Sequence, residues 1–270
     1  MGRIGRSFAL VGQSYRLLMQ DKELMVLPLI SGVIMIVVVI AIALGFGVDT
    51  SRIERHGPDT YLPLFLIYVV TYSIGIFFQA AVVAGATERM RGGDPTVGSA
   101  LAAAARRIGA ILAWAVVAAT VGVIIRMIHD RIGFLGKIVA TLLGAAWSLA
   151  TFFVVPVLVL EERSIPESFK RSVSVFRQTW GETVVGGTTL GAAAVCAWLT
   201  LIAITGLLSM VIGVAAVAVF AIGALALMIF FSALQGVYVA SLYRFATDNG
   251  STPGLDQSLM RQAFVPRKRT

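Results

Sequence analysis

The residues of this chain whose types and spacing suit chemistry are basic, and they lie in short segments among apolar neighbours. Arg106 and Arg107 end one such segment, and Lys170, Arg171 and Arg177 lie in another. Cations beside an apolar surface suit the phosphate headgroups of anionic lipids, and each is worth roughly 1 kcal/mol near a membrane surface. These residues are therefore the predicted contacts to lipid headgroups.

A second group consists of uncharged polar side chains inside long apolar runs, namely Gln79, Ser148, Thr151 and Gln235. Hydrogen bonding between helices is the ordinary role of such residues in a membrane, and the alternative is that they line a substrate path. No Asp, Glu, Lys or Arg lies near the middle of any run. A proton-driven pump usually keeps an ionisable group there, so this pattern argues against one.

Motifs for catalysis are missing from the sequence, which has no HExxH, GxSxG, Walker A loop or GxGxxG after a strand. The neighbours Glu161 and Glu162 point in different directions on a helix and do not form an acid/base pair by default. His56 and His129 fall in different loops, where solvation is favoured over a metal site. The single cysteine, Cys196, excludes a disulfide within the chain. The sequence predicts neither an enzyme nor a cofactor or metal site.

The elements that position these residues are long apolar runs. Hydrophobic residues make up 58% of the chain and charged residues 13%, with a mean hydropathy of +0.89, whereas a soluble domain is about half apolar and a quarter charged. A helix needs about 20 residues to cross about 30 Å of hydrocarbon. Six runs are long enough: 24–48, 62–86, 108–128, 134–160, 183–205 and 209–242. The first is too long for a cleaved signal and is predicted to be retained.

The runs are arranged in what looks like a threefold repeat. Each repeat contains two apolar runs, a pair of phenylalanines and a proline that opens the next basic segment. The pairs are Phe77-Phe78, Phe152-Phe153 and Phe230-Phe231, and the prolines are Pro95, Pro166 and Pro253. The predicted fold is all-α: one integral membrane domain, 1–270, with six transmembrane helices as three repeated hairpins, 1–90, 91–163 and 164–246, and a basic tail, 247–270.

Orientation follows from the basic residues, because segments on the cytoplasmic side carry an excess of Lys and Arg. The segments 1–23, 87–107, 161–182 and 243–270 hold 17 of the 22 Lys and Arg residues. Both termini and all the basic segments are therefore predicted to be cytoplasmic, in the plasma membrane. The same bias explains the pI near 10.1, so nucleic acid is not a predicted partner.

The basic segments have amphipathic helical patterns. Phe169, Val173, Phe176 and Trp180 form one apolar stripe, and a similar stripe at the N-terminus consists of Ile4, Phe8, Val11, Tyr15 and Leu18. The versions at 96–107, with an Asp94-Pro95 cap, and at 255–264 are weaker. Such helices are predicted to lie in the interface as anchors, and a sharper hypothesis makes them a cytoplasmic collar that holds anionic headgroups.

Several short signals predict local geometry. Ser164 with Glu167, and Thr179 with Glu182, have the spacing of capping boxes that open two helices. Pro156 lies deep in the fourth run and is expected to kink it. Gly187 and Gly191, with Ala194 on the same face, form a small-residue ridge that permits close packing of helices. The last run is too long for one perpendicular span, so it tilts, kinks near Gly223 or continues beyond the bilayer.

Three stretches carry a resemblance: 114–122, 150–161 and 177–182, the last reading Arg-Gln-Thr-Trp-Gly-Glu. They resemble an uncharacterised prokaryotic family of six-helix membrane proteins, known as a domain of unknown function. The wider layout resembles the membrane domain attached to some bacterial glycerophosphodiester phosphodiesterases. The resemblance implies a polytopic helical fold and supplies no catalytic residues.

The leading functional hypothesis is a non-enzymatic membrane protein that handles, transports or senses a lipid or small amphiphile at the inner leaflet. The predicted partners are membrane lipids, anionic ones above all. The runner-up is a membrane scaffold or assembly subunit with a protein partner or a second copy of the chain. A passive channel is a third alternative, which requires Gln79, Ser148, Thr151 and Gln235 to face one water-filled path.

Overall fold

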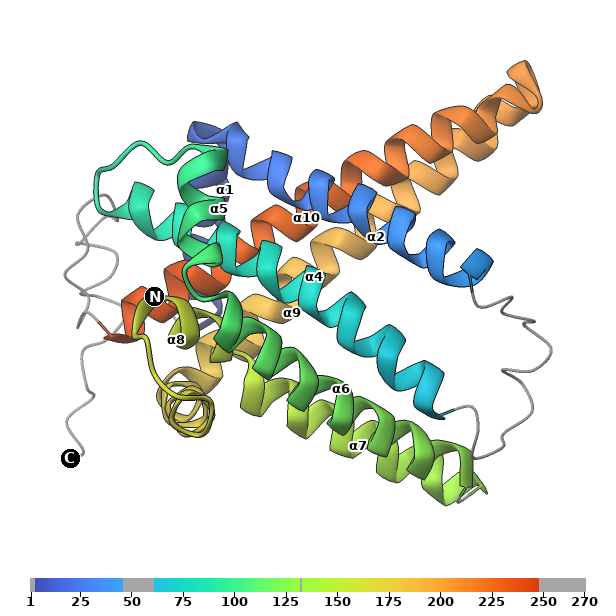
Figure 1. Ribbon diagram of the computed structural model, residues 1–270. Coiled ribbons are helices and arrows are strands. Elements are labelled where there is room, and N and C mark those ends of the chain that lie inside the picture. Colours follow the sequence, from blue (N-terminus) through green and yellow to red (C-terminus); the bar gives the residue numbers. More distant parts are fainter. Residues whose placement is uncertain (1–2, 46–60, 132, 248–270) are drawn as a thin grey trace, which may run out of the picture. The chain divides into compact units, whose positions relative to one another are not determined.

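A computed structural model describes residues 3–45, 61–131 and 133–247, and every regular element in these ranges is a helix (Figure 1). The all-α prediction is therefore confirmed for the described part of the chain. The elements are α1 (Arg3–Gln20), the 3₁₀-helix η1 (Lys22–Met25), α2 (Val26–Gly45), α4 (Tyr61–Met90), α5 (Val97–Ala105), α6 (Ile108–Arg131), α7 (Gly133–Thr151), α8 (Val154–Leu160), α9 (Ile165–Ile212) and α10 (Ala215–Thr247).

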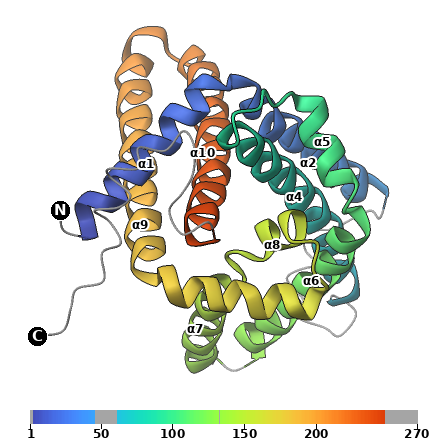
Figure 2. The same ribbon diagram turned by 90° about the vertical axis from the view of Figure 1, so that its left-hand side faces the viewer.

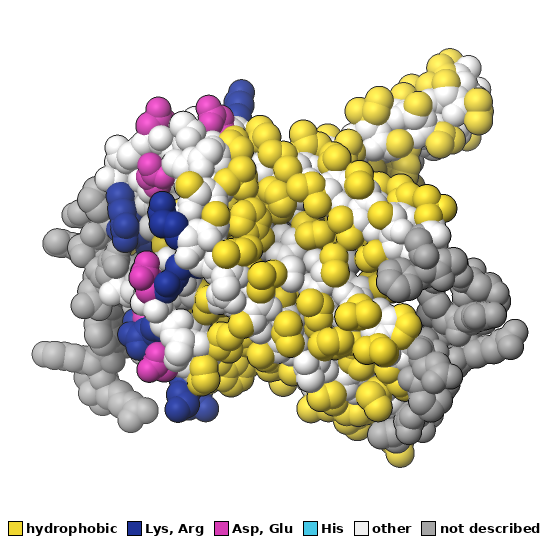
Figure 3. Space-filling view, viewed as in Figure 1, with side chains coloured by type: hydrophobic (Ala, Val, Ile, Leu, Met, Phe, Trp, Pro, Cys, Tyr) yellow, Lys and Arg dark blue, Asp and Glu magenta, His cyan; other side chains and the backbone are white. Residues whose placement is uncertain are grey.

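Six helical stretches are long and apolar enough to cross a membrane, in agreement with the six predicted runs. Much of their apolar surface is exposed, as Leu142 and Ile222 illustrate, and yellow apolar side chains cover the helices in Figure 3. An exposed apolar surface of this extent suits lipid rather than water. The stretches are Lys22–Ile42, Tyr61–Met90, Ile108–Asp130, Leu135–Leu160, Thr183–Ile212 and Ala215–Thr247.

The chain divides into two compact units that alternate along the sequence. Unit 1 contains Met1–Pro28, Gly85–Val97 and Arg177–Thr270, and unit 2 contains Leu29–Ala84 and Gly98–Phe176. Two of the phenylalanine pairs lie within unbroken helices, α4 and α10, whereas Phe152 and Phe153 lie between α7 and α8. The threefold repeat and its boundaries stay a prediction.

Unit 2 is built on the hairpin of α6 and α7, which pack side by side (Figure 1). Trp114 of α6 stacks on Trp147 of α7 with ring centroids 5.7 Å apart, and Phe169 of α9 stacks on Trp147 at 5.8 Å. Trp114 also packs with Val154 and Leu158 of α8 to form a buried cluster. Stacked aromatic rings therefore join α6, α7 and the first part of α9.

Unit 1 contains the hairpin of α9 and α10, which Figure 2 shows joined by a tight turn. A Cβ at Gly186 would overlap the hydroxyl of Tyr238, and Leu201 packs against Gly223. Gly187 and Gly191, by contrast, have open space beside them. The close approach of α9 to α10 therefore uses Gly186 rather than the predicted ridge of Gly187 and Gly191.

Helix α1 packs on α10 within the same unit. Leu18 is buried and Tyr15 contacts Phe230 edge-on with ring centroids 6.2 Å apart, although Tyr15 is about half exposed. The part of the predicted N-terminal stripe from Val11 to Leu18 therefore faces protein only in part. The side chains of Ile4 and Phe8, and the predicted helix at 255–264, lie outside the described residues.

Helix α9 runs farther than the sequence predicts, whereas α10 begins at Ala215 rather than at residue 209 and ends at Thr247 rather than at residue 242. The predicted cap of Thr179 and Glu182 is wrong, because α9 is one helix from Ile165 to Ile212 and Thr179 lies in its interior. No proline interrupts its hydrogen bonds after Pro166, and the Thr179 and Thr183 hydroxyls bond each other at 3.2 Å. Helix α10 continues unbroken past Gly223, so of the three alternatives for the last run the kink is not observed.

Three helix ends share a left-handed residue just after the last turn. At the end of α4 this residue is Gly92, and the N–H groups of Gly92 and Gly93 donate to the carbonyls of Arg89 and Glu88. At the end of α9 the residue is Gly213. Glycine suits these positions because it lacks a Cβ. At the end of α8 the equivalent residue is Glu162, with φ +55°, the only non-glycine residue with positive φ among those described.

Candidate functional site

The fourth apolar run is interrupted at the place that Pro156 dictates. Proline has no N–H, and its ring clashes with the carbonyl four residues earlier, which belongs to Phe152. Helix α7 accordingly ends at Thr151 and α8 begins at Val154. The predicted effect of Pro156 is confirmed as a full break, which leaves backbone groups of α7 and α8 without helical partners inside a stretch apolar enough to span a membrane.

Ser172 of α9 supplies the missing hydrogen bonds. The Phe153 N–H donates to Ser172 Oγ at 3.0 Å, and Ser172 Oγ donates to the carbonyl of Ala150 at 2.7 Å. Phe153 and Ser172 are fully buried. Unsatisfied backbone groups are costly in a membrane, so an irregular backbone there must be buried and bonded by protein. One hydroxyl therefore satisfies both sides of the break.

In the first part of α9 the buried face is not the apolar stripe, which the sequence predicts to lie in the membrane interface. Ser168, Ser172 and Val175 are buried, whereas Phe169, Val173 and Phe176 of the predicted stripe are half-buried and Trp180 is exposed. Each of these buried residues thus comes one position before a residue of the aromatic stripe. The physical reason is that a hydroxyl is needed at the α7–α8 break, while the aromatic ring of Phe169 can still reach the Trp114–Trp147 stack from the edge.

Ser168 lies one turn before Ser172 on the same buried face. Its Oγ is buried and, among the described residues, has no hydrogen-bond partner. Neither serine contacts a base within the described residues: Ser172 bonds only backbone groups. A serine nucleophile needs an adjacent general base, and the Ser172 hydroxyl is instead engaged with backbone groups on both sides of the break.

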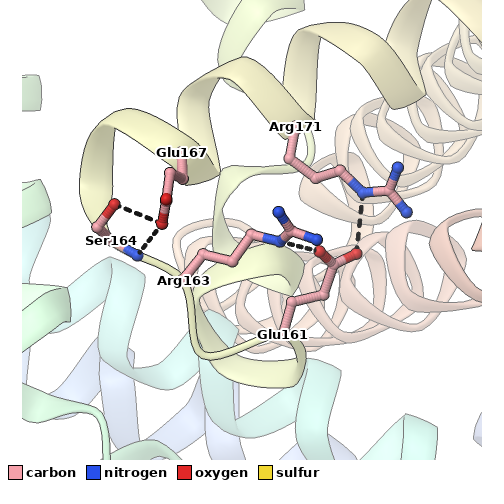
Figure 4. Close-up of polar contacts among 5 residues, drawn as sticks. All are labelled: Glu161, Arg163, Ser164, Glu167 and Arg171. Atoms are coloured by element: carbon pink, nitrogen blue, oxygen red, sulfur yellow. Dashed lines mark hydrogen bonds and ion pairs between the residues drawn. The ribbon is translucent and has the colours of Figure 1, made fainter.

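At one end of unit 2 an acidic pair, Glu161 and Glu162, connects two basic dipeptides, Arg106-Arg107 and Lys170-Arg171. We call this group the acidic clasp. Glu161 accepts hydrogen bonds from Arg163 and from Arg171, the latter at 3.0 Å (Figure 4). Glu162 pairs with Arg107 at 3.6 Å, and Arg107 also donates to the carbonyl of Leu158 at 3.2 Å. The clasp ties α6 and α9 to the C-terminal end of α8.

The clasp divides the predicted headgroup contacts into two classes. Arg107 and Arg171 are held by carboxylates, as described above. Arg106 and Lys170, the other member of each dipeptide, are exposed and form no ion pair with any described residue. Arg177, in unit 1, is exposed and unpaired in the same sense. Three of the five predicted cations therefore have charges available to an external anion.

The start of α9 carries the predicted capping interaction. Glu167 accepts hydrogen bonds from Ser164 Oγ at 2.7 Å and from the Ser164 N–H at 3.2 Å (Figure 4). These bonds hold the pKa of Glu167 below its ordinary value, and the nearby charges of Arg163 and Lys170 add to the effect. Glu167 is therefore engaged with the backbone of its own helix rather than with the clasp.

The four predicted intramembrane polar residues are divided between the two units. Ser148 and Thr151 of unit 2 donate to carbonyls of their own helix, those of Gly144 and Trp147, at 2.9 and 2.8 Å. Gln79, also in unit 2, is half-buried, and Gln235 of unit 1 is exposed. Ser148 and Thr151 thus bond within α7 rather than between helices.

Unit 1 contains a separate ion pair that the sequence did not reveal. Arg89, in the last turn of α4, donates to both carboxylate oxygens of the buried Asp21, with one distance of 2.6 Å, and to the carbonyl of Gly93. Glu23 of η1 accepts from the N–H of Val97, at the start of α5, at 3.3 Å. These bonds fix the loop between α4 and α5, which contains the predicted Asp94-Pro95 cap.

The opposite end of α6 has the predicted pair of Arg126 and Asp130, at 2.9 Å, and His129 also contacts Asp130 at 3.1 Å. Among the described residues no three His, Cys, Asp or Glu side chains could hold a metal ion. His56 lies outside the described residues.

Two signals could have revealed the site from the sequence. The spacing Ser164, Ser168, Ser172 repeats a hydroxyl every four residues along one helical face, beside a run that contains a proline. The acidic pair Glu161-Glu162 lies between two basic dipeptides in the sequence order.

The comparison with protein families identifies one match: a family described as "Family of unknown function (DUF6159)" covers residues 59–253. This is more than half of the chain, so the chain belongs to that family. The expected resemblance to an uncharacterised family is thereby confirmed, whereas the layout of the glycerophosphodiester phosphodiesterase membrane domain is not supported. No curated protein matches the chain.

Proposed function

We propose that this member of the family of unknown function is a non-enzymatic membrane protein that handles, transports or senses a lipid or another small amphiphile. Its ligand carries an anionic headgroup and enters from the inner leaflet, and both termini of the protein are cytoplasmic in the plasma membrane. The observation that carries the proposal is the pair of exposed cations, Arg106 and Lys170, each next to an arginine that the acidic clasp holds in place.

Apolar surface adjoins these cations. Arg106 is followed by α6, whose Ile108 and Leu112 are exposed, and Lys170 is followed along α9 by the half-buried Val173 and Phe176. A cation beside an apolar surface matches an amphiphile with a phosphate headgroup and acyl chains. A soluble anion would match the charges and leave the apolar surface unused.

The clasp explains why Arg106 and Lys170, rather than their neighbours, are the proposed contacts. Arg107 and Arg171 already have carboxylate partners, and separating them would break one ion pair each of Glu162 and Glu161. The carboxylates in turn hold the two dipeptides in fixed positions, so the free cations lose less freedom when a headgroup binds. In this arrangement Arg107 and Arg171 are positioning residues.

The test compares two lysines of unit 2 that are both exposed, one beside the clasp and one at the other end of α7. Lys170→Gln removes a proposed contact, and Lys137→Gln is the matched control. We expect native mass spectrometry of protein extracted without delipidating detergent to show retained anionic lipid, with affinity reduced about fivefold by Lys170→Gln, since one charge near the surface is worth roughly 1 kcal/mol. Lys137→Gln should change it little.

Combining Arg106→Gln with Lys170→Gln should enlarge the loss, because the two cations act on one anionic headgroup or on neighbouring ones. Equal retention by the double variant and the wild type would overturn the proposal. A stoichiometric protein partner in the same spectra, with no retained lipid, would favour the scaffold or assembly subunit. Ion flux through reconstituted vesicles would favour the passive channel.

A further inference from the structure

The hairpin of α9 and α10 has no charge along its length beyond its base. From Thr183 to Tyr243 the sequence contains no Asp, Glu, Lys, Arg or His. Its tip, at the upper right of Figure 3, displays apolar yellow side chains with no blue or magenta on the visible face. In most transmembrane hairpins a polar loop marks the place where the chain returns to water, and this hairpin has no such marker.

The exposed surface at the tip extends around the helix rather than along one face. Met210 is 84% exposed, Val211 82% and Val214 87%. Met210 and Val211 are neighbours and so point about 100° apart on a helix, and Leu207 and Val217 are also exposed. A folded partner covers one side of a helix, whereas acyl chains cover every side. The distribution of exposure therefore fits lipid better than a second protein surface.

Several polar groups of the tip are bonded within the hairpin. The hydroxyls of Thr205 and Ser209 donate to the carbonyls of Leu201 and Gly206 at 2.7 and 2.6 Å. At the turn, the Gly213 N–H donates to Ser209 O, and the N–H groups of Ala216 and Val217 donate to the carbonyls of Gly213 and Val214. Backbone that is satisfied in this way can remain in hydrocarbon, where water offers no replacement.

The length of the free part of the hairpin also suits the hydrocarbon layer. Helix α1 contacts α10 at Phe230 through Tyr15, and α1 carries exposed Arg16 and Gln20, which need the headgroup region. From Phe230 to Val214 the helix extends about 24 Å at 1.5 Å per residue. This is less than the hydrocarbon thickness of about 30 Å, so the part of the hairpin beyond its contact with α1 is shorter than one full crossing.

We infer that the turn of the α9–α10 hairpin lies inside the hydrocarbon and contacts lipid acyl chains through Met210, Val211 and Val214. The α6–α7 hairpin differs, because its tip carries Arg126, His129 and Asp130 and therefore lies in the polar region. The hairpin of unit 1 is on this basis embedded from the inner face without returning to water at its tip. The inference depends on the membrane location of the helices and not on the headgroup contacts proposed above.

The test is a spin label at two single cysteines, each in a Cys196→Ser background. Val214→Cys reports on the inferred buried turn, and His129→Cys reports on the charged tip of α6 as the control. The proteins are reconstituted in vesicles of phosphatidylcholine and phosphatidylglycerol. Collision rates are then measured with oxygen, which concentrates in hydrocarbon, and with a water-soluble nickel complex.

We expect the Val214 label to collide frequently with oxygen and at least tenfold less with the nickel complex than the His129 label does. Nickel collisions at Val214 equal to those at His129 would place the turn in water and overturn the inference. Low collision rates with both reagents at Val214 would show that protein covers the turn, and would overturn the assignment to lipid in favour of a second copy or another chain. Val214 is so exposed that its replacement should not affect folding.

Discussion

The hairpins α6–α7 and α9–α10 are both pairs of apolar helices, yet they satisfy their polar groups by different means. In α6–α7 the two ends carry charges, Arg107 at one and Arg126 at the other, about 29 Å apart at 1.5 Å per residue. That separation matches a hydrocarbon layer of about 30 Å. In α9–α10 charges occur only near the base, and the hydroxyls toward the tip bond carbonyls of their own helices.

The difference shows that an apolar helix can depend on its neighbours or be nearly independent of them. The chain that follows α6–α7 is broken at Phe152 and Phe153, so it needs Ser172 from another helix. The α9–α10 hairpin has no such break and needs only a close approach at Gly186. The region of α6–α8 therefore requires a particular hydrogen-bond partner, Ser172, whereas the α9–α10 hairpin requires a close fit of its two helices at Gly186.

The largest expected effect tests the dependence of the break on its partner. Ser172→Ala removes the acceptor of the Phe153 N–H and the donor to Ala150 O in a buried place. An orphaned buried group costs about 1–3 kcal/mol, so we expect the free energy of unfolding to fall by about 3 kcal/mol. Unfolding of the purified protein in mixed micelles, followed by circular dichroism, measures the change.

Two controls separate a lost partner from a lost hydroxyl. Ser168→Ala removes a buried hydroxyl that has no partner among the described residues, so it should leave stability unchanged or raise it slightly. Thr205→Val removes a hydroxyl that bonds carbonyls of its own helix, those of Leu201 and Ile202, and its effect should be small. If all three substitutions lowered stability equally, the proposed bridge by Ser172 would be wrong.

The next effect tests the shape of the α9–α10 hairpin. Gly186→Ala places a methyl group where Tyr238 lies, and overpacking of this kind costs about 2 kcal/mol. Gly187→Ala, at the next position, has open space and should be neutral or stabilising by up to about 1 kcal/mol, because alanine favours helix. The same unfolding measurement compares the two, and equal values would contradict the assigned contact.

A smaller effect, with the opposite sign, concerns the end of α8. Glu162 occupies a left-handed position that glycine fills at Gly92 and Gly213. Glu162→Gly should raise the free energy of unfolding by about 0.5–1 kcal/mol, because the ion pair lost with Arg107 is long, at 3.6 Å, and its carboxylate is exposed, so the pair is worth little. Glu162→Ala, which loses the pair and keeps the strain, should not be stabilising.

A stabilising Glu162→Gly that also weakened lipid retention would show that the glutamate is kept for the acidic clasp rather than for the fold. If lipid retention by Glu162→Gly did not change, Arg107 would have no positioning role.

The smallest effect is a pH dependence at the start of α9. Hydrogen bonds from Ser164 keep the pKa of Glu167 in the folded protein below 4.5. The stability that this carboxylate contributes is therefore fully present above pH 4.5 and is lost as the pH falls through the lowered pKa. The stabilities of the wild type and Glu167→Gln should converge below pH 4.5, and Ser164→Ala should raise the pKa of Glu167 in a carbon NMR titration.

The spans could be predicted from the sequence because hydrocarbon thickness fixes the length of an apolar run. The break could also be predicted, because a proline removes one backbone hydrogen bond wherever it lies in a helix. The partner of the break could not be predicted, because Ser172 is 16 residues beyond Pro156 on a helix that was expected to lie in the membrane interface. Periodicity finds the most apolar face, but here the buried face was selected by a hydrogen bond.

The basic contacts were predictable as a group and not individually. Arg106 and Arg107 are equivalent in composition, and only the position of Glu162 assigns one of them to an ion pair. The same holds for Lys170 and Arg171 beside Glu161. The Asp21–Arg89 pair connects residues far apart in the sequence, so no local pattern indicates it.

Ser172 lies later in the chain than the break it closes, and this order has a consequence for biosynthesis. The ribosome releases α7 and α8 before α9, so the backbone at Phe153 enters the membrane without its partner. During that interval nothing in unit 2 holds the α7–α8 break in its final geometry. The fourth crossing should therefore become fixed only when the chain has been translated beyond Ser172, which makes the start of α9 the step that commits unit 2 to its final arrangement.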